Sequence, residues 1–169
     1  KVSRVKRAQY FDVLAQLVKA NQKKLADAIS LETGKSLNEA NAEVIESLHM
    51  CQYAAASGTQ PYGQMIASEL SEKDSWTFRK PKGVVAIISP WNFPLAIGSF
   101  WCAAPAIVEG NCVVHKPSEY TPYVAQLMAE LYDQAGFPPG VFNLIHGMED
   151  TGKELVRDSH VDVILFTGS

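Results

Sequence analysis

The sequence contains few of the residues that build a disulfide framework, a zinc site or a nucleic-acid surface. Its three cysteines, Cys51, Cys102 and Cys112, form no C-x-x-C pair among the 169 residues. This pattern argues against disulfide or zinc stabilisation and is typical of a reducing compartment, so we expect a cytoplasmic protein. The 15 Lys and Arg against 18 Asp and Glu give a net charge of −3, which provides no electrostatic footprint for nucleic acid.

Long apolar runs are also missing. The longest, residues 95–108, is shorter than the roughly 20 residues of a membrane span and is bounded by Pro94 and Gly110. We therefore expect a buried helix there and no membrane association. No signal peptide is recognisable, and the chain starts at Lys1 and stops at Ser169 directly after a predicted strand, so both ends look cut. The composition, 47% hydrophobic and 20% charged, is that of a globular domain.

Apolar residues recur at helical spacing in the first part of the chain. The stripe in residues 1–31 predicts one amphipathic helix. Ser36 and Glu39 fit a capping box that begins a second helix, and Gly58 ends it. Residues 60–82 predict two short strands and a turn. A hairpin of this size cannot bury itself, so it should lie against another element or another subunit.

From Gly83 onward, strand-like runs alternate with helical segments. The predicted strands are Val84–Ile88, Cys112–His115, Val141–Ile145 and Val161–Phe166, and the predicted helices are Pro94–Glu109, Pro122–Ala135 and Asp150–Asp158. Such alternation is typical of right-handed βαβ units. We therefore expect an α/β fold with a parallel, doubly wound sheet.

The first of these strands leads into a turn that displays one amide. Pro90 and Pro94 restrict φ on either side of Asn92, so its side chain projects from a stiff turn at the carboxyl end of the strand. Ligands of open α/β sheets bind at this edge. A fixed amide can donate a hydrogen bond to a substrate carbonyl as it gains negative charge. The alternative is a proline-rich turn in which asparagine is only a turn former.

The next two strands end in further candidate binding groups. Lys116 and Glu119 lie three residues apart and could hold two ribose hydroxyls, the ammonium donating and the carboxylate accepting. Taken alone, the pair is better explained as a solvent-facing ion pair worth about 0–1 kcal/mol. Gly147 follows the third strand and Gly152 opens the next helix, where a pyrophosphate could approach a helix N-terminus. The turn is not G-x-G-x-x-G, and no P-loop occurs.

Six short motifs follow one another along the chain. They are Glu32-Thr33-Gly34-Lys35, Pro90-Trp91-Asn92-Phe93-Pro94, Gly110-Asn111, Lys116-Pro117-Ser118-Glu119, Gly136-x-Pro-x-Gly140 and Phe166-Thr167-Gly168-Ser169. Their order and spacing resemble the NAD(P)-dependent aldehyde dehydrogenase superfamily over essentially the whole chain. The resemblance implies a Rossmann-like parallel sheet with flanking helices, two N-terminal helices and a protruding oligomerisation β-hairpin. It assigns residues 1–60 and 82–169 to a partial NAD(P)-binding domain and residues 61–81 to the hairpin of a homo-oligomer, either a dimer or a tetramer.

The resemblance also implies the chemistry. The enzyme would oxidise an aldehyde to a carboxylic acid with NAD or NADP through a cysteine thiohemiacetal, and Asn92 would be the catalytic oxyanion-hole amide. Glu119 would repel a 2′-phosphate and favour NAD, whereas Lys116 could tolerate that phosphate. The implied cofactor-binding residues are Ser89, Pro90, Trp91, Lys116, Ser118, Glu119, Gly147, Gly152, Phe166, Thr167, Gly168 and Ser169. Phe93, Ile97 and Trp101 could line the aldehyde tunnel, although core packing explains them at least as well.

Two members of the family's catalytic machinery are expected outside this chain. The nucleophilic cysteine and the general-base glutamate of the family lie downstream of the Phe166–Ser169 motif, so the chain alone would be inactive. Its own cysteines are expected to be small buried hydrophobes with raised thiol pKa values, and no histidine spacing supports a metal site. Two alternatives stay open: a non-catalytic nucleotide-binding fragment, and a segment of a related acyl-CoA or acyl-phosphate reductase. The run Pro94–Ile97 resembles members that act on semialdehydes.

Overall fold

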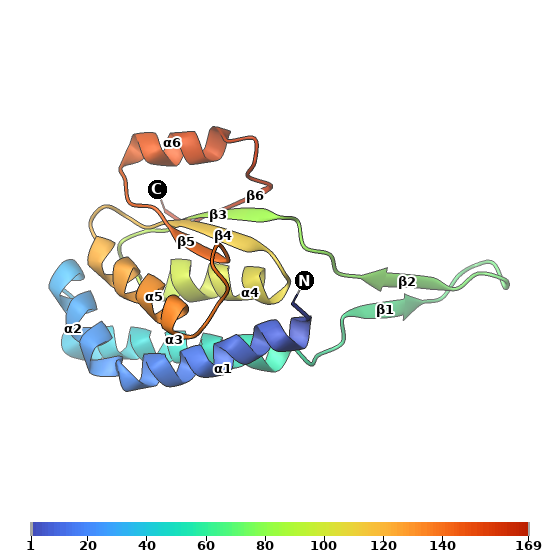
Figure 1. The fold of residues 1–169 in the computed structure, drawn as a ribbon, viewed down its shortest axis with the longest axis horizontal. Helices are drawn as coiled ribbons and strands as arrows, with labels where there is room; N and C mark the ends of the chain where they lie inside the picture. Colours follow the sequence, from blue (N-terminus) through green and yellow to red (C-terminus); the bar gives the residue numbers. More distant parts are fainter. Residues whose placement is uncertain (1, 169) are drawn as a thin grey trace.

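The computed structural model describes residues 2–168 and arranges them as a layered α/β body from which a hairpin projects (Figure 1). The N-terminal helices are α1 (Arg4–Ala20), α2 (Gln22–Thr33) and α3 (Leu37–Ser57). They form the outer layer on one side of the body. The hairpin strands β1 (Gly63–Ile66) and β2 (Ser75–Phe78) follow, and the chain then returns to the body to build the sheet.

Among the described residues, four parallel strands form one sheet in the order β5-β4-β3-β6. They are β3 (Val84–Ile88), β4 (Cys112–Lys116), β5 (Phe142–Leu144) and β6 (Val163–Phe166). The predicted parallel α/β sheet is therefore confirmed. β5 and β6 are one or two residues shorter at their ends than the predicted strands, although Val141, Ile145 and Asp162 still hydrogen-bond to the neighbouring strands.

Helices cover the two faces of this sheet unequally. The segment η1 (Ile97–Cys102), α4 (Ala103–Val108) and α5 (Pro122–Gln134) lie between the sheet and the N-terminal helices, whereas α6 (Glu149–Arg157) lies on the opposite face (Figure 1). The three helices predicted after Gly83 are thus present. In the part of the chain that the structure describes, no helix is long and apolar enough to cross a membrane.

The helix predicted over Pro94–Glu109 is not a uniform α-helix. Residues 97–102 form a π-helix, and regular α-helix begins only at Ala103. A π-turn holds one more residue than an α-turn, so the α-helical hydrogen-bonding pattern is interrupted there. The Ser99 carbonyl, inside this segment, accepts a hydrogen bond from the Tyr132 hydroxyl at 2.6 Å. A continuous apolar run carries no signal of the change, because its hydrophobic pattern reads the same in either helix.

The single helix predicted over residues 1–31 is wrong, because the chain changes direction at Asn21. The φ and ψ of Asn21 are −100° and 12°, and its side-chain amide donates to the Leu17 carbonyl at 2.9 Å. Asparagine thus satisfies the end of α1 while α2 starts at the next residue. The apolar stripe continues through the break, so periodicity alone joins the two helices. The fold accordingly has three N-terminal helices where two were expected.

The predicted capping box at the start of α3 is confirmed. The Ser36 hydroxyl accepts from the Glu39 amide at 3.3 Å, and the Glu39 carboxylate accepts from the Ser36 amide at 3.1 Å. The hydrogen bond from the Ser36 side chain is the main cause of a lowered Glu39 pKa. Just before this box, Gly34 has φ +74°, which allows α2 to end in a tight left-handed turn.

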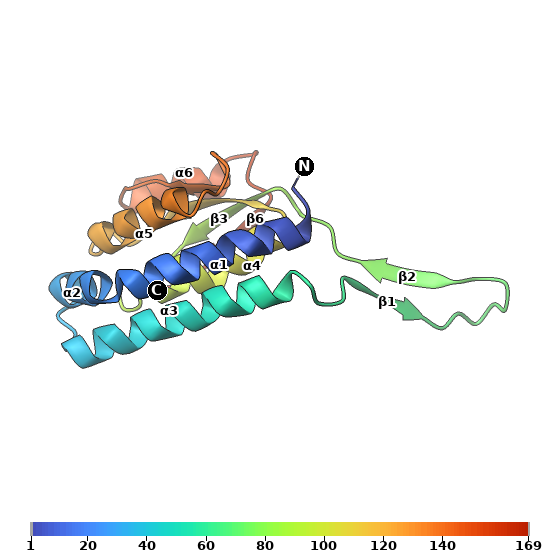
Figure 2. The same ribbon diagram turned by 60° about the horizontal axis from the view of Figure 1, so that its bottom comes forward.

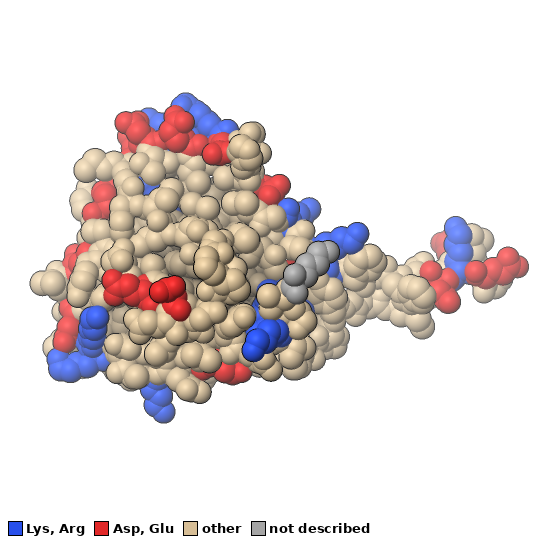
Figure 3. Space-filling model, in the orientation of Figure 1, with Lys and Arg blue, Asp and Glu red and all other residues tan. Residues whose placement is uncertain are grey.

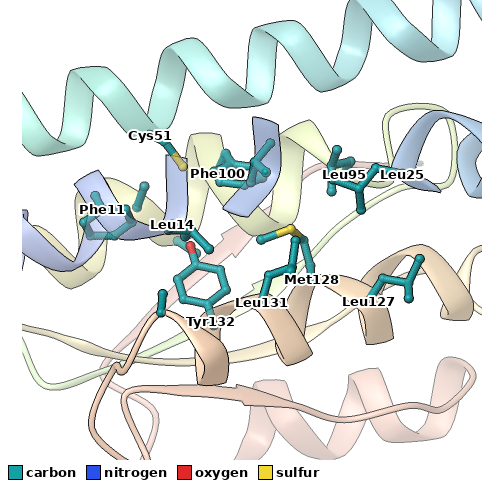
Figure 4. Packing of buried hydrophobic residues seen from close by; sticks show 14 of the residues in the cluster. Phe11, Leu14, Leu25, Cys51, Leu95, Phe100, Leu127, Met128, Leu131 and Tyr132 are labelled. Carbon is teal, nitrogen blue, oxygen red and sulfur yellow. The ribbon is translucent and has the colours of Figure 1, made fainter. Parts of the chain in front are cut away.

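The main core lies between the N-terminal helices and the sheet-covering helices. Figure 4 shows Phe11 and Leu14 from α1, Cys51 from α3 and Tyr132 from α5 meeting in one cluster. Phe100 of the π-helix also enters it and is fully buried. The layer formed by α1–α3 therefore covers the helices that follow β3 and β4. The start of each of these helices is held against a packed surface.

The hairpin projects from this body and leaves apolar side chains exposed. β1 and β2 pair antiparallel with Met65 opposite Trp76, and both side chains are largely exposed, as is that of Phe78. Figure 2 shows the hairpin extending beyond the ends of the helices, and Figure 3 shows charges of both signs gathered at its tip. The predicted hairpin is thus present, and within residues 2–168 the apolar side chains of Met65, Trp76 and Phe78 on its two strands stay largely exposed.

Candidate functional site

The site is built at the carboxyl ends of β3, β4 and β6. The chain leaves β3 toward the face of η1 and α5, but it reaches β6 from α6 on the other face, so the strand order reverses between β3 and β6. In doubly wound sheets this point opens a crevice in which ligands bind. The Thr167 amide donates to the Ile88 carbonyl at 3.0 Å, and the Ser89 amide donates to the Lys116 carbonyl at 3.2 Å. Three of the predicted motifs therefore meet at one sheet edge.

Asn92 lies in the turn after β3, where its side chain is exposed. Ser89, at the start of the turn, is buried, and Pro90 is half-buried. The turn closes when the Ile97 amide donates to the Phe93 carbonyl at 3.3 Å. An exposed amide held between fixed backbone on both sides is the arrangement expected of a hydrogen-bond donor for a developing charge.

A buried carboxylate, which sequence reasoning missed, holds the end of this turn. Glu43 projects from α3, and its Oε1 accepts from the amides of Leu95 and Ala96 at 2.9 and 3.2 Å. Its Oε2 lies 2.7 Å from the Lys35 ammonium. The available signal was a charged residue on the buried face of the predicted second helix, directly before Val44. Nothing in that pattern identifies a partner 52 residues away.

The three residues considered for the aldehyde tunnel have different surroundings. Ile97 is buried, Phe93 is half-buried under the Lys35 ammonium, and Trp101 is exposed on the π-helix. Trp91, one of the residues implied in cofactor binding, is also exposed, beside Asn92. The core interpretation therefore fits Ile97 best, and Trp101 is the one of the three whose side chain is free to meet a substrate.

The group after β4 differs from a surface ion pair. The Lys116 side chain is 6% exposed, and its Nζ donates to the Pro117 carbonyl at 3.0 Å. The Glu119 carboxylate, 40% exposed, lies 3.8 Å from the same Nζ. Ser118 is buried, and its hydroxyl accepts from the Tyr120 amide at 3.3 Å. A buried ammonium beside a half-exposed carboxylate at the sheet edge presents both a donor and an acceptor to a ligand.

The third and fourth turns complete the edge. Gly152 of α6 lies against the Lys116 side chain, and an added Cβ there would be 3.7 Å from Lys116 Cδ. At Gly147 an added Cβ would overlap the side chain of Thr151, so this close approach requires glycine. Phe166, the last residue of β6, is exposed, as are Thr167 and Gly168 after it. Ser169, the last residue implied in cofactor binding, lies outside the described residues.

A buried histidine supports the same edge from inside. His115 Nε2 lies 2.8 Å from the Ser89 hydroxyl, which ties the ends of β3 and β4 together. Burial is the main reason that the His115 pKa falls to about 3, and the charges of His146 and Lys116 add to it. His115 is thus neutral at physiological pH and has no open path to a substrate. In residues 2–168, no group of three or more His, Cys, Asp or Glu could hold a metal ion.

The cysteines behave as expected with one exception. Cys51 is fully buried and Cys102 is half-buried, and burial raises the pKa of both thiols. The prediction that Cys112 is also buried is wrong. This residue is exposed because it occupies the first position of β4, at the edge of the packed layers. None of the three lies among the residues that form the site, although Cys102 ends the π-helix that follows the Asn92 turn.

These features define the chain as a doubly wound α/β protein with a ligand crevice at its switch point. The profile of the aldehyde dehydrogenase family matches residues 1–169. The chain belongs to this family. The resemblance drawn from the six motifs is therefore confirmed, and the family is one of oxidoreductases.

Known proteins similar to this chain share both sequence and fold. Betaine aldehyde dehydrogenase of Bacillus subtilis (strain 168) is 40% identical over 156 residues, which are 92% of this chain and 32% of that protein. Malonate-semialdehyde dehydrogenase 1 of Geobacillus kaustophilus (strain HTA426) is 38% identical over 164 residues, covering 97% of this chain and 33% of that protein. The chain thus spans about a third of the length of these relatives.

Solved structures agree. The NAD-dependent aldehyde dehydrogenase from Sinorhizobium meliloti superimposes with a TM-score of 0.90 at 36% identity, over 96% of this chain and 32% of that chain. A double mutant of betaine aldehyde dehydrogenase from Staphylococcus aureus, solved in complex with NAD+, has a TM-score of 0.90 at 33% identity over 96% of this chain and 33% of that chain. The expected fold class is therefore confirmed.

Proposed function

We propose that this chain is part of a longer enzyme that oxidises an aldehyde to a carboxylic acid, with NAD+ as the preferred acceptor and NADP+ as the alternative. The observation that carries the proposal is the exposed Asn92 amide at the switch point, in a chain of the aldehyde dehydrogenase family. The chain would supply cofactor binding and the oxyanion-hole amide. The remainder of the enzyme would supply the cysteine that forms the thiohemiacetal and the general-base glutamate.

In this mechanism Asn92 acts on the substrate oxygen. When a thiolate adds to the aldehyde, the carbonyl oxygen gains negative charge, and an amide N–H aimed at it stabilises the tetrahedral centre. The turn that holds the amide is fixed at both ends, so little reorganisation is needed at the moment of reaction. Trp101 is the residue of the three candidates that we assign to the aldehyde entrance, because its side chain is exposed on the same segment.

The donors and acceptors at the edge fit a dinucleotide. Lys116 and Glu119 present an ammonium and a carboxylate that match the vicinal hydroxyls of a ribose. Gly147 packs against Thr151, and Gly152 packs against Lys116, at the start of α6, where a pyrophosphate would lie. A nicotinamide bound at this edge would supply the hydride acceptor for the reaction. The contacts implied for Ser89, Pro90, Trp91, Phe166, Thr167 and Gly168 around this cofactor are part of the same proposal.

Two other functions make different predictions. A related acyl-CoA or acyl-phosphate reductase would use the same edge, but in the direction of aldehyde oxidation its enzyme thioester would pass the acyl group to coenzyme A or phosphate instead of water. A non-catalytic nucleotide-binding fragment would bind NAD+ without turnover. The names of the relatives, betaine aldehyde and malonate-semialdehyde dehydrogenases, favour aldehyde oxidation. These two aldehydes are therefore the first substrates to test, and products with and without coenzyme A distinguish the reductase.

The test is the kinetics of the full-length enzyme and its Asn92→Ala variant. Loss of one oxyanion-hole donor costs roughly 10²–10³ in kcat, so we expect a fall of that size with the KM for NAD+ nearly unchanged. An unchanged kcat, with chemistry shown to be rate-limiting, contradicts the role of Asn92. Isothermal titration of the chain itself with NAD+ and NADP+ asks separately whether these residues form a complete cofactor site.

A further inference from the structure

A buried ion pair lies directly behind the turn that displays Asn92. Glu43 of α3 has a side chain that is 0% exposed, and the Lys35 side chain is 19% exposed. Their Oε2 and Nζ atoms are 2.7 Å apart. Removing two charges from water costs free energy, so a buried ion pair is by itself weak evidence that the interaction stabilises the fold. Its contacts with the turn are therefore the informative feature.

The two members of the pair hold different residues of the segment that follows Asn92. The free oxygen of Glu43 accepts from the Leu95 and Ala96 amides, which are the first unpaired donors of the helical segment that follows the turn. The Lys35 ammonium lies 3.8 Å from the centroid of the Phe93 ring, within cation–π range. Phe93, Leu95 and Ala96, which follow Asn92, are thus fixed to α3 and to the loop before it.

The geometry of these contacts is unusual for a helix cap. A local serine or asparagine at the start of the segment would satisfy one amide at lower cost. A carboxylate from a separate helix instead ties the turn to the rigid outer layer, and Lys35 neutralises the charge that this requires. A displacement of about 1 Å in a group that contacts the reacting atoms can lower a rate by roughly a hundredfold.

We propose that Lys35 and Glu43 are positioning residues, which hold the backbone after Asn92 so that its amide points at the developing oxyanion. They touch neither substrate nor cofactor and act through Asn92. The proposal rests on the proposed function, because it assumes that Asn92 is an oxyanion donor. It adds a physical role for Lys35 of the Glu32–Lys35 motif, to which the family resemblance assigns none.

The test uses the full-length enzyme with Glu43→Gln and Lys35→Met. Glutamine keeps an acceptor for the two amides but loses the bond to the ammonium, and methionine removes the cation while keeping most of the side-chain volume. We expect each to lower kcat by roughly tenfold to a hundredfold, with the KM for NAD+ changed less than about twofold. Lys35→Arg keeps the charge and the contact with the Phe93 ring, so we expect it to restore most of the activity.

A matched control separates positioning from stability. The Arg4 and Glu109 side chains form a similar partly buried ion pair, with N and O 2.8 Å apart, at the opposite edge of the same layers. Glu109→Gln is expected to lower the unfolding temperature without lowering kcat. If Glu43→Gln and Lys35→Met behave like Glu109→Gln, the proposal is overturned. If Glu43→Gln does not fold, the Lys35→Met and Lys35→Arg pair decides.

A double-mutant cycle tests the route through Asn92. Once Asn92 is alanine there is no amide to position, so we expect Lys35→Met to lower kcat much less in the Asn92→Ala background than in the wild type. Fully additive effects overturn the positioning role even if Asn92 itself is catalytic. A wild-type enzyme without any aldehyde oxidation overturns the proposed function instead, and this outcome is visible before any variant is made.

Discussion

At the scale of single residues, the candidate site combines side chains that a local motif identifies with others that only the fold brings in. Asn92, Lys116 and Glu119 could be selected from the sequence because each follows a predicted strand, and strand ends meet at one sheet edge. Glu43 could not be selected, since its partners are amides 52 and 53 residues along the chain. The burial of Lys116 was equally out of reach, because a Lys–Glu pair three residues apart looks like a surface ion pair.

The half-exposed carboxylate of Glu119 leads to a prediction on cofactor preference. A negative charge at this position repels a 2′-phosphate, while the buried Lys116 ammonium beside it attracts one. We expect Glu119→Gln to raise kcat/KM for NADP+ relative to NAD+ by roughly tenfold, about 1.4 kcal/mol of discrimination. Steady-state kinetics of the full-length enzyme with both cofactors measure this ratio. Glu130→Gln, an exposed glutamate on α5, is the control, and an equal ratio in both variants contradicts the prediction.

The buried His115 makes stability depend on pH in a defined window. Its pKa is about 3 in the folded protein, against roughly 6.5 in an unfolded chain. Between these values the unfolded state binds the extra proton, so the free energy of unfolding falls as the pH falls, by up to about 1.4 kcal/mol per pH unit. We expect urea midpoints to decrease from pH 7 to pH 5. His115→Gln should flatten this slope, whereas His49→Gln, at an exposed histidine, should leave it intact; equal slopes in both variants would argue against it.

At the scale of elements, the sequence is informative where both partners of an interaction are close together. The capping box of α3 involves residues three positions apart, and the strands and helices after Gly83 follow from short periodic runs. The break at Asn21 and the π-helix of residues 97–102 alter the backbone without altering the apolar pattern. The cap of α5 is also invisible locally, since Glu32 accepts from the Tyr123 and Val124 amides at 2.8 Å from more than 90 residues away.

The capping box gives a prediction for the stability of α3. Ser36 satisfies the Glu39 amide, and its own amide is satisfied in return by the Glu39 carboxylate. Replacing such a residue by alanine costs about 1 kcal/mol, within a range of roughly 0.5–2. We expect Ser36→Ala to lower the free energy of unfolding by that amount in denaturant titrations. Ser71→Ala, in the exposed loop of the hairpin, should change it little, and the opposite ranking would contradict the cap's contribution.

At the scale of the whole molecule, the hairpin is the feature that the body does not explain. The sequence predicted its strands and its need for a partner. In the structure, Tyr62 and Arg79 at its base contact Arg4 and Glu109 of the body, whereas the stem formed by β1 and β2 projects beyond the helices (Figures 1 and 2). The Trp76 side chain is 67% exposed and Met65 lies opposite it on β1. A two-stranded sheet with exposed apolar side chains is unstable in water unless another protein surface covers it. We therefore propose that residues 61–81 join subunits of a homo-oligomer.

This proposal predicts that a charge on the hairpin stem reduces the oligomer. We expect Trp76→Asp in the full-length enzyme to shift the mass measured by light scattering toward a smaller species, because a carboxylate would be buried against apolar partners without a counter-charge. Lys73→Glu also changes charge, but Lys73 lies in the exposed loop between β1 and β2, so the mass should stay that of the wild type. The unfolding temperature of the Trp76→Asp subunit should fall little, since the hairpin lies outside the core. An unchanged mass for Trp76→Asp would show that the hairpin stem does not form the subunit interface, and its exposed apolar face would then have no explanation.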